Sequence, residues 1–397
     1  MSHFLNPVLM QAFCDTIKSS PIFTNDEKYK GHYNLFCVVM ERLDKCVNYL
    51  NQHSEPPKTE EDFITFLVFS CMIIDATKML LKELGIENEY SSSISQNSFK
   101  FFRTVCMSSP LNISEADCPT DDKFFEYLRA LAFAHPFETS RPKFLLEEEI
   151  QYSPWVISNT DCREMGEIAD GVGIVIYSSN DGGGDGIKVV CFSFSILKNY
   201  ILSRYLLIIE ITEWAKTQIA DAKEEWKKYK INRNGTSIQI LEEIAASLKS
   251  RYKEYSDAET AIIYLKCSTT VHANEKAVSL YRQAIVDVLP ALCDSIEAFD
   301  YEAYSNKIDS VLQARPEKVY KGLPYQLEKI FTCLDNDTPS IKTGFALAQV
   351  DAFSKGFAKD YVSIRPYEMS YDEIHLLVST ALYLEWRKQM ADTPTER

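Results

Sequence analysis

The stretch EKYKGHYNLFCVVMERLDKCVNYLNQ, residues 27–52, decides the fold class of this chain, because its apolar side chains recur at steps of three and four. Such spacing places them in one stripe along a single long helix. The stripe consists of Tyr33, Phe36, Val39, Met40, Leu43, Cys46, Val47 and Leu50. The prolines at 56 and 57 end this helix, since proline lacks a backbone donor and restricts the residue before it. A second helix is predicted from Thr59 to about Leu84, because Thr-Glu-Glu-Asp is typical of a helix start. The two helices are expected to form an antiparallel pair.

The chain changes character around residues 171–178 (GVGIVIYS) and 187–194 (IKVVCFSF), which are rich in β-branched and aromatic residues. A glycine-rich segment separates them. Two such runs joined by turn residues predict a β-hairpin. Residues 153–158 are a candidate for a short third strand.

Helical periodicity returns after residue 195 and continues almost to the end of the chain. The expected helices cover residues 196–229, 236–255, 257–267, 274–299, 301–313, 323–335, 340–355 and 370–390. The sequence therefore predicts a mainly α protein. We expect an N-terminal helical bundle at 1–150, a β-hairpin insertion at 151–196 and a C-terminal helical domain at 197–397.

The composition narrows the classes of function. The 397 residues include 42 Lys and Arg against 57 Asp and Glu, which gives a net charge of −15. An acidic chain of ordinary globular composition is not expected to coat nucleic acid nonspecifically, so any phosphate-binding surface must be a local basic patch. Residues 215–233, which combine lysines with Trp226 and Tyr229, are one candidate patch, although a solvated helix face is the simpler interpretation.

The cellular setting is inferred from what the sequence lacks. The first residues show no signal-peptide pattern, and no run of about 18 uninterrupted apolar residues occurs. The 11 cysteines are scattered without a CxxC pair, which is typical of reduced core cysteines rather than a disulfide framework. We therefore expect a cytoplasmic protein with no membrane contact.

The chemistry is expected at the end of a shorter apolar helix that starts near Asp121. His135 ends this helix because Pro136 follows, and Arg129 lies six positions earlier. A helix C-terminus favours a protonated imidazole, which suits a proton-transferring group near neutral pH. On a regular helix the two side chains would be about 9 Å apart along the axis and about 120° apart around it. One copy would not easily close both groups on a single phosphate, whereas two copies around a twofold axis would.

An Arg, five intervening residues and a His at a helix end, after two long antiparallel helices, resembles the motif of the HEPN superfamily. The resemblance covers roughly residues 20–150. Members are all-helical and usually dimeric, and many are metal-independent ribonucleases in toxin–antitoxin, abortive-infection and CRISPR-linked defence. Ala130 stands where the commoner form of the motif has Asn or another polar residue, so this chain lacks a phosphate-orienting side chain there.

The resemblance implies a reaction and a set of partners. His135 would act as the acid or base, and Arg129 would bind the phosphate while the RNA 2′-hydroxyl attacks, which gives a 2′,3′-cyclic phosphate and a 5′-hydroxyl. Thr139 and Arg141 directly after the motif, and Arg103 before it, are candidate substrate-binding residues. RNA is the implied substrate, a homodimer the implied assembly, and an antitoxin or activating protein the candidate partner. No cofactor or metal is implied.

Other interpretations of these residues stay open at the sequence level. Arg129 would serve structure alone if it capped carbonyls or paired with Glu126 or an acid of residues 147–149. His135 would then be a helix-end residue that donates to a local carbonyl. In that case the chain would be a non-catalytic scaffold or sensor that binds a protein partner in a defence system. A small-molecule enzyme is a third class, for which no motif is present.

Overall fold

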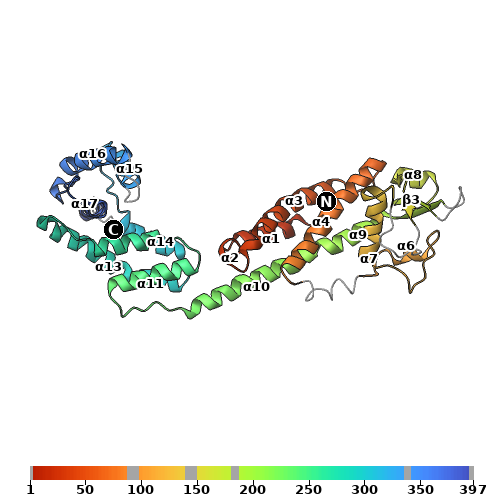
Figure 1. Ribbon diagram of the computed structural model, residues 1–397, viewed down its shortest axis with the longest axis horizontal. Coiled ribbons are helices and arrows are strands. Elements are labelled where there is room, and N and C mark those ends of the chain that lie inside the picture. Colours follow the sequence, from red (N-terminus) through yellow and green to blue (C-terminus); the bar gives the residue numbers. More distant parts are fainter. Residues whose placement is uncertain (1–2, 87–97, 139–149, 180–186, 335–340, 393–397) are drawn as a thin grey trace. The chain divides into compact units, whose positions relative to one another are not determined.

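The computed structural model describes residues 3–86, 98–138, 150–179, 187–334 and 341–392. The chain is mainly helical, with 67% helix and 5% strand, which confirms the predicted class. Its internal packing divides it into two compact units, unit 1 (Met1–Asp221) and unit 2 (Ala222–Arg397). Figure 1 labels the elements of both units, and each unit is described here by itself.

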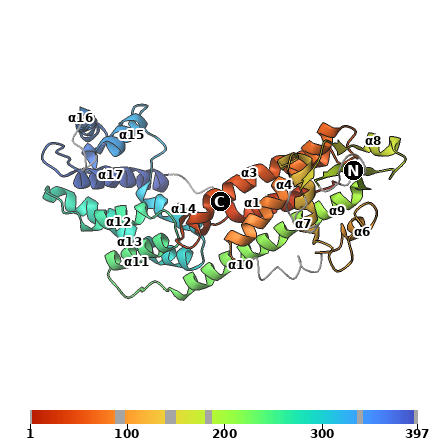
Figure 2. The ribbon, with the colours of Figure 1, turned by 45° about the vertical axis from the view of Figure 1, so that its right-hand side comes forward.

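Unit 1 is built on the predicted helix pair. Helix α3 (Tyr33–Gln52) lies beside α4 (Glu60–Glu83) in both views (Figures 1 and 2), and the short link between them makes the pair antiparallel. The buried side chains of α3 are those of the predicted stripe, except that Tyr33 is half-buried. Thr59 caps α4 by accepting a hydrogen bond from the Asp62 amide at 3.1 Å.

Further helices complete the helical part of unit 1. They are α1 (Pro7–Lys18), α2 (Ile22–Asn25), η1 (Lys30–His32), α6 (Arg103–Met107), α7 (Asp121–Arg129), η2 (Ala130–Ala134), α8 (Asn159–Glu164), α9 (Phe194–Tyr205) and α10 (Leu207–Lys228). Helices α9 and α10 correspond to the long helix predicted at 196–229, for which one break was considered, and the break lies at Leu206. The boundary between the two units falls within α10.

A small antiparallel sheet packs on these helices. The strands β3 (Gly171–Ser178) and β4 (Lys188–Ser193) form the predicted hairpin, with Ile174 paired to Val190. Two short strands, β1 (Gln151–Tyr152) and β2 (Val156–Ile157), pair with β3 where one strand was expected. Gly173 is required in β3, because a Cβ at this position would collide with the Val190 carbonyl oxygen.

The predicted boundaries at residues 150 and 196 do not coincide with the division into two units. The sheet is not a separate insertion, because β2 packs against α4, and β3 packs against η2. Helix α9, assigned from the sequence to the C-terminal domain, also packs along α4. Unit 1 therefore combines the helix pair, the sheet and α9 in one body.

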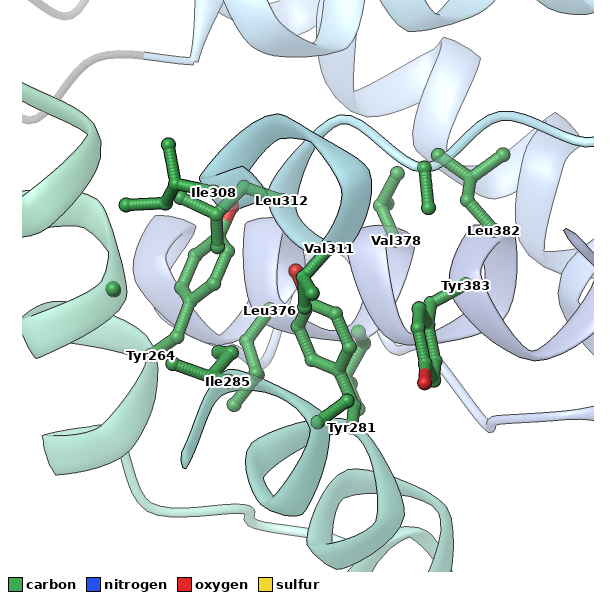
Figure 3. Close-up of a cluster of buried hydrophobic side chains, with 14 of the residues drawn as sticks. Tyr264, Tyr281, Ile285, Ile308, Val311, Leu312, Leu376, Val378, Leu382 and Tyr383 are labelled. Atoms are coloured by element: carbon green, nitrogen blue, oxygen red, sulfur yellow. The ribbon is translucent and has the colours of Figure 1, made fainter. Parts of the chain in front are cut away.

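Unit 2 is a helical body with its own core. Its helices are α11 (Ser237–Ser250), α12 (Ser256–Lys266), η3 (His272–Asn274), α13 (Glu275–Glu297), α14 (Tyr301–Leu312), α15 (Leu323–Cys333), α16 (Ile341–Gly356), η4 (Ala358–Asp360) and α17 (Tyr371–Asp392). Helix α17 packs against α12, α13 and α14 (Figure 2). Tyr264, Tyr281 and Tyr383 lie among aliphatic side chains at the centre of this core (Figure 3).

Helix α4 also bears on the expectation of no membrane contact. Among the described helices, it alone is long and apolar enough to cross a membrane by length and composition. Half of the most apolar 18-residue stretch of α4 is buried inside the protein, where α4 packs against α3 and α9. A buried core helix passes the same test, so α4 does not by itself identify a membrane span.

Candidate functional site

The candidate site lies at the C-terminal end of α7. Thr120 caps the start of this helix by accepting a hydrogen bond from the Lys123 amide at 3.3 Å. The α-helix continues to Arg129, and the last turn, η2, is a π-helix rather than the expected α-helix. The His135 amide accordingly donates to the Ala130 carbonyl at 2.8 Å, five residues back. The chain leaves the helix at His135, as predicted from the following proline.

The π-helical turn changes the geometry that the sequence predicted. A π turn closes with a bond from residue i to i+5 and is found mostly as single turns, often at functional sites. The rotation of about 120° between Arg129 and His135 assumed a regular α-helix, so it does not apply to this segment. Leu131 and its alanine neighbours at 130 and 132 are buried, and η2 packs against β3. The sheet therefore supports the irregular turn.

Hydrogen bonds to the sheet hold the chain both before and after His135. The Ser153 amide, between β1 and β2, donates to the Pro136 carbonyl at 2.8 Å. On α7, the buried Tyr127 hydroxyl donates to the Gln151 side chain of β1. The His135 side chain is exposed. A histidine at the surface on an anchored backbone has a defined position and contact with solvent.

Arg129 is also accessible. Its side chain is 39% exposed, and Nη1 lies 3.5 Å from Oδ2 of Asp75 on α4. The Asp75 side chain is 64% exposed. The ion-pair partner of Arg129 is therefore neither Glu126 nor any other residue of its own helix. An exposed ion pair of this kind contributes only about 0–1 kcal/mol, so a phosphate can compete with Asp75 for the guanidinium.

Cys71 lies beneath the same guanidinium. It is 7% exposed, and burial raises the pKa of its thiol to about 12, although the Arg129 charge acts in the opposite direction. A thiol with this pKa stays protonated near neutral pH, so it does not supply a nucleophile. Cys71 therefore adds a neutral group next to the arginine.

An exposed aromatic side chain follows the motif and was not singled out from the sequence. Phe137 is 86% exposed, two residues after His135. Exposed aromatic rings beside cationic groups provide stacking surfaces for unpaired bases. The signal for it was present in the sequence, since an apolar ring directly after His-Pro lies beyond the end of the buried helix face.

The three candidate substrate-binding residues are not all placed with this pair. Thr139 and Arg141 lie outside the described residues, as do the acids at 147–149. Arg103 forms an ion pair with Glu115 at 2.5 Å. It follows Phe102, whose amide donates to Asp121 at the opposite end of α7 from Arg129. A helix of this length separates the two ends by about 12 Å, so the structure does not bring Arg103 to the Arg129 end.

The N-terminal end of α7 carries a polar network that the sequence did not reveal. Asp122 Oδ1 accepts from Arg204 Nε at 2.9 Å and from the Tyr200 hydroxyl at 2.6 Å, both on α9. Lys78 of α4 lies 3.6 Å from the same oxygen. Burial alone would raise the pKa of Asp122, but hydrogen bonding and charge from Arg204 hold this pKa below its ordinary value. The network joins three helices of unit 1.

Asp121 completes this end of the helix. Its fully buried carboxylate accepts hydrogen bonds from three successive backbone amides, at residues 100, 101 and 102. Burial raises the pKa of Asp121, whereas these amide bonds oppose the rise. Because the surrounding chain satisfies both carboxylates, this end of α7 has a structural role.

Two further sequence interpretations concern surface charge and metals. In the candidate patch at 215–233, Lys216, Lys227 and Lys228 each pair with a glutamate three residues earlier, which favours a solvated helix face. Within the part of the chain that the structure describes, no three His, Cys, Asp or Glu side chains are grouped so as to hold a metal ion.

Comparison of the chain with family models, with curated proteins and with solved structures gave no significant match.

Proposed function

We propose that this protein is a metal-independent endoribonuclease of the HEPN type, acting in the cytoplasm as a phage-defence or toxin effector. The observation that carries the proposal is that Arg129 and His135 are both solvent-accessible at the same end of α7, on either side of a π-helical turn. Sealing either group in the interior would have excluded the reaction.

The chemistry follows from the two side chains. RNA carries its own nucleophile, the 2′-hydroxyl, so the protein must move protons and stabilise the charge that builds on the phosphorus centre. His135 exchanges the proton, and general acid–base catalysis of this kind contributes about 10² to 10⁴-fold to the rate. Arg129 leaves the weak pair with Asp75 and binds two phosphate oxygens. Phe137 offers a stacking surface for a neighbouring base.

A single copy supplies one guanidinium and one imidazole, so the proposal includes a homodimer. Two copies related by a twofold axis would place two Arg129/His135 pairs around one phosphate. Activity per chain is therefore expected to fall on dilution into the range where light scattering shows monomers. An antitoxin or activating protein is the proposed regulatory partner.

The decisive experiment is RNA cleavage in EDTA by the full chain and its variants. Single-stranded RNA with a 5′ label should be cut to fragments that end in a 2′,3′-cyclic phosphate. We expect Arg129→Ala and His135→Ala to lower the rate about 10² to 10⁴-fold. Arg42→Ala, an exposed arginine on α3, and His272→Ala, an exposed histidine of unit 2, are matched controls that should keep the wild-type rate.

The competing function is a non-catalytic scaffold or sensor that binds a protein partner. It predicts equal cleavage, or none, in all five proteins, with Arg129→Ala weakening only partner binding. Equal rates in wild type and in both site variants would remove the ribonuclease proposal. Toxicity on expression that His135→Ala relieves and His272→Ala does not would support it in the cell.

A further inference from the structure

Unit 2 contains a cavity that the proposed ribonuclease reaction does not use. It has a volume of about 650 Å³ and lies among α12, α14, α15 and α17. This volume is within the range of about 300–1,000 Å³ that small-molecule sites occupy. All of its lining residues belong to unit 2, so the inference is independent of the Arg129/His135 site.

One wall of the cavity is apolar. Leu312, Leu323, Leu327 and Phe331 supply it, from α14 and α15. The ring of Tyr264 extends from α12 toward Leu312 (Figure 3), and its hydroxyl is 3.2 Å from Ser379 Oγ on α17. A ligand body without polar groups would exclude water from this wall, which is the usual source of small-molecule affinity.

The polar wall is centred on Arg315. Its guanidinium lies over the Phe331 ring, 5.6 Å from the ring centre. The His375 ring also stacks on Phe331. Nη1 donates to the Ala314 carbonyl at 3.0 Å, and Nη2 donates to the Gln313 side chain at 3.2 Å. Arginine has five N–H donors, so these two bonds within the described residues leave donors that can bind a ligand.

The charges around the cavity leave Arg315 without a carboxylate partner among the described residues. Two acids, Glu328 and Asp257, also line the cavity, but neither forms an ion pair with Arg315 among the described residues. Glu328 is 59% exposed and pairs with Lys329 at 2.6 Å. Asp257 lies near two other acids, Asp309 and Glu254, and burial is the main cause that raises its pKa. Burial lowers the pKa of Arg315, which indicates that its charge is incompletely compensated.

We propose that this cavity binds a small organic anion whose apolar body packs on the leucine and Phe331 wall while its carboxylate or phosphate pairs with Arg315. Arg315 is partly buried, so its guanidinium has lost part of its hydration, and a ligand anion would supply a counter-charge with two hydrogen bonds. The site thereby becomes selective for amphipathic anions over neutral molecules of the same shape.

The test uses a matched pair of fluorescent probes on the full chain. 8-Anilino-1-naphthalenesulfonate carries an anion, and N-phenyl-1-naphthylamine has the same body without it. We expect the anionic probe to bind wild type at least tenfold more tightly than the neutral one. Arg315→Met should weaken the anionic probe about tenfold or more and leave the neutral probe within twofold. Arg365→Met, an exposed arginine of unit 2 paired with Glu368, is the matched control and should change neither.

Two further arms settle the outcome. Displacement of the anionic probe by 1-naphthoate or by 1-naphthyl phosphate distinguishes a carboxylate from a phosphate ligand, and displacement by neither at millimolar concentration would overturn the proposal. Equal binding of both probes to wild type would also overturn it, even if Arg315→Met failed to fold. Arg315→Lys, which keeps the charge but loses the fork of donors, should give an intermediate affinity.

Discussion

The two ends of α7 carry the same kinds of groups in opposite settings. At the N-terminal end, Asp122 and Arg204 form an ion pair in which the arginine is only 2% exposed. At the C-terminal end, Arg129 and Asp75 form an ion pair in which the two side chains are 39% and 64% exposed and the atoms are 3.5 Å apart. One helix therefore carries a charge pair with a buried arginine at one end and an exposed, weakly held pair at the other.

The difference indicates which end is committed to stability and which is open to a ligand. A buried charge pair is strongly destabilised by loss of one partner, because the other is left uncompensated. An exposed pair is screened by water and is worth little. The regular helix also belongs to the buried end, whereas the π turn and the exposed Phe137 belong to the open one. Substitutions of the acid in each ion pair test this difference between the two ends of α7.

The largest effect is expected from Asp122→Ala. This change leaves the Arg204 guanidinium buried beside Tyr200 without its carboxylate, at a cost of about 3–5 kcal/mol. For a unit of this size, each kcal/mol lowers the Tm by about 2–4 °C. Scanning calorimetry should therefore show the transition of unit 1 shifted down by about 6–20 °C.

Asp75→Ala is the matched control, since it removes the same kind of group from the exposed pair. It should shift the same transition by no more than about 1 kcal/mol, or roughly 4 °C. Similar shifts in the two variants would mean that the ends of α7 do not differ in the way proposed here.

The two ion pairs also show why some features could be predicted from the sequence and others could not. The C-terminal end of α3, the limits of α17 and the β3–β4 hairpin were predictable because hydrophobic periodicity and turn residues are local signals, whereas α3 begins at Tyr33, six residues after the predicted start at 27. The Asp122–Arg204 pair joins residues 82 positions apart, so no local spacing identifies it. One signal was available, since Arg204 lies in the apolar stripe of α9 with Tyr200 four residues before it, and a buried arginine requires an acid.

The candidate site was predicted as two residues, but its geometry was not. Arg129, His135 and the helix end at Pro136 follow from residue types and from the rules for proline. The π turn between them packs against β3, a strand about 40 residues later in the chain, and helical periodicity does not reveal such a long-range contact. Asp75 lies 54 positions from Arg129 in the sequence, so no local pattern identifies this partner either.

A smaller effect is expected from acid, again at the buried end. The folded pKa of Asp122 lies below its ordinary value of about 3.9, so the unfolded chain binds this proton more readily. The stability it contributes is therefore complete above pH 4 to 5 and is lost as the pH falls through the lowered folded pKa. Asp122→Asn removes the titration, so the difference in Tm between wild type and this variant should shrink steadily below pH 4.

Taking the difference between wild type and Asp122→Asn cancels the opposite contribution of Asp121, whose pKa is raised mainly by burial. Melting curves between pH 7 and pH 2.5 measure it. A gap in Tm that stays constant over this range would show that the charge of Asp122 does not stabilise the fold.

The smallest effect is expected from Asp75→Asn, at the open end. An amide keeps the size of the side chain but removes the negative charge 3.5 Å from Arg129 that an RNA phosphate would displace in the proposed reaction. Because the exposed pair is worth at most about 1 kcal/mol, the KM for RNA should fall by no more than about fivefold with kcat unchanged, and the Tm should fall by no more than in Asp75→Ala. Steady-state cleavage in EDTA separates the two constants. If Arg129 had only a structural role, losing its partner would leave KM unchanged, so a lower KM at unchanged kcat assigns the guanidinium to the substrate.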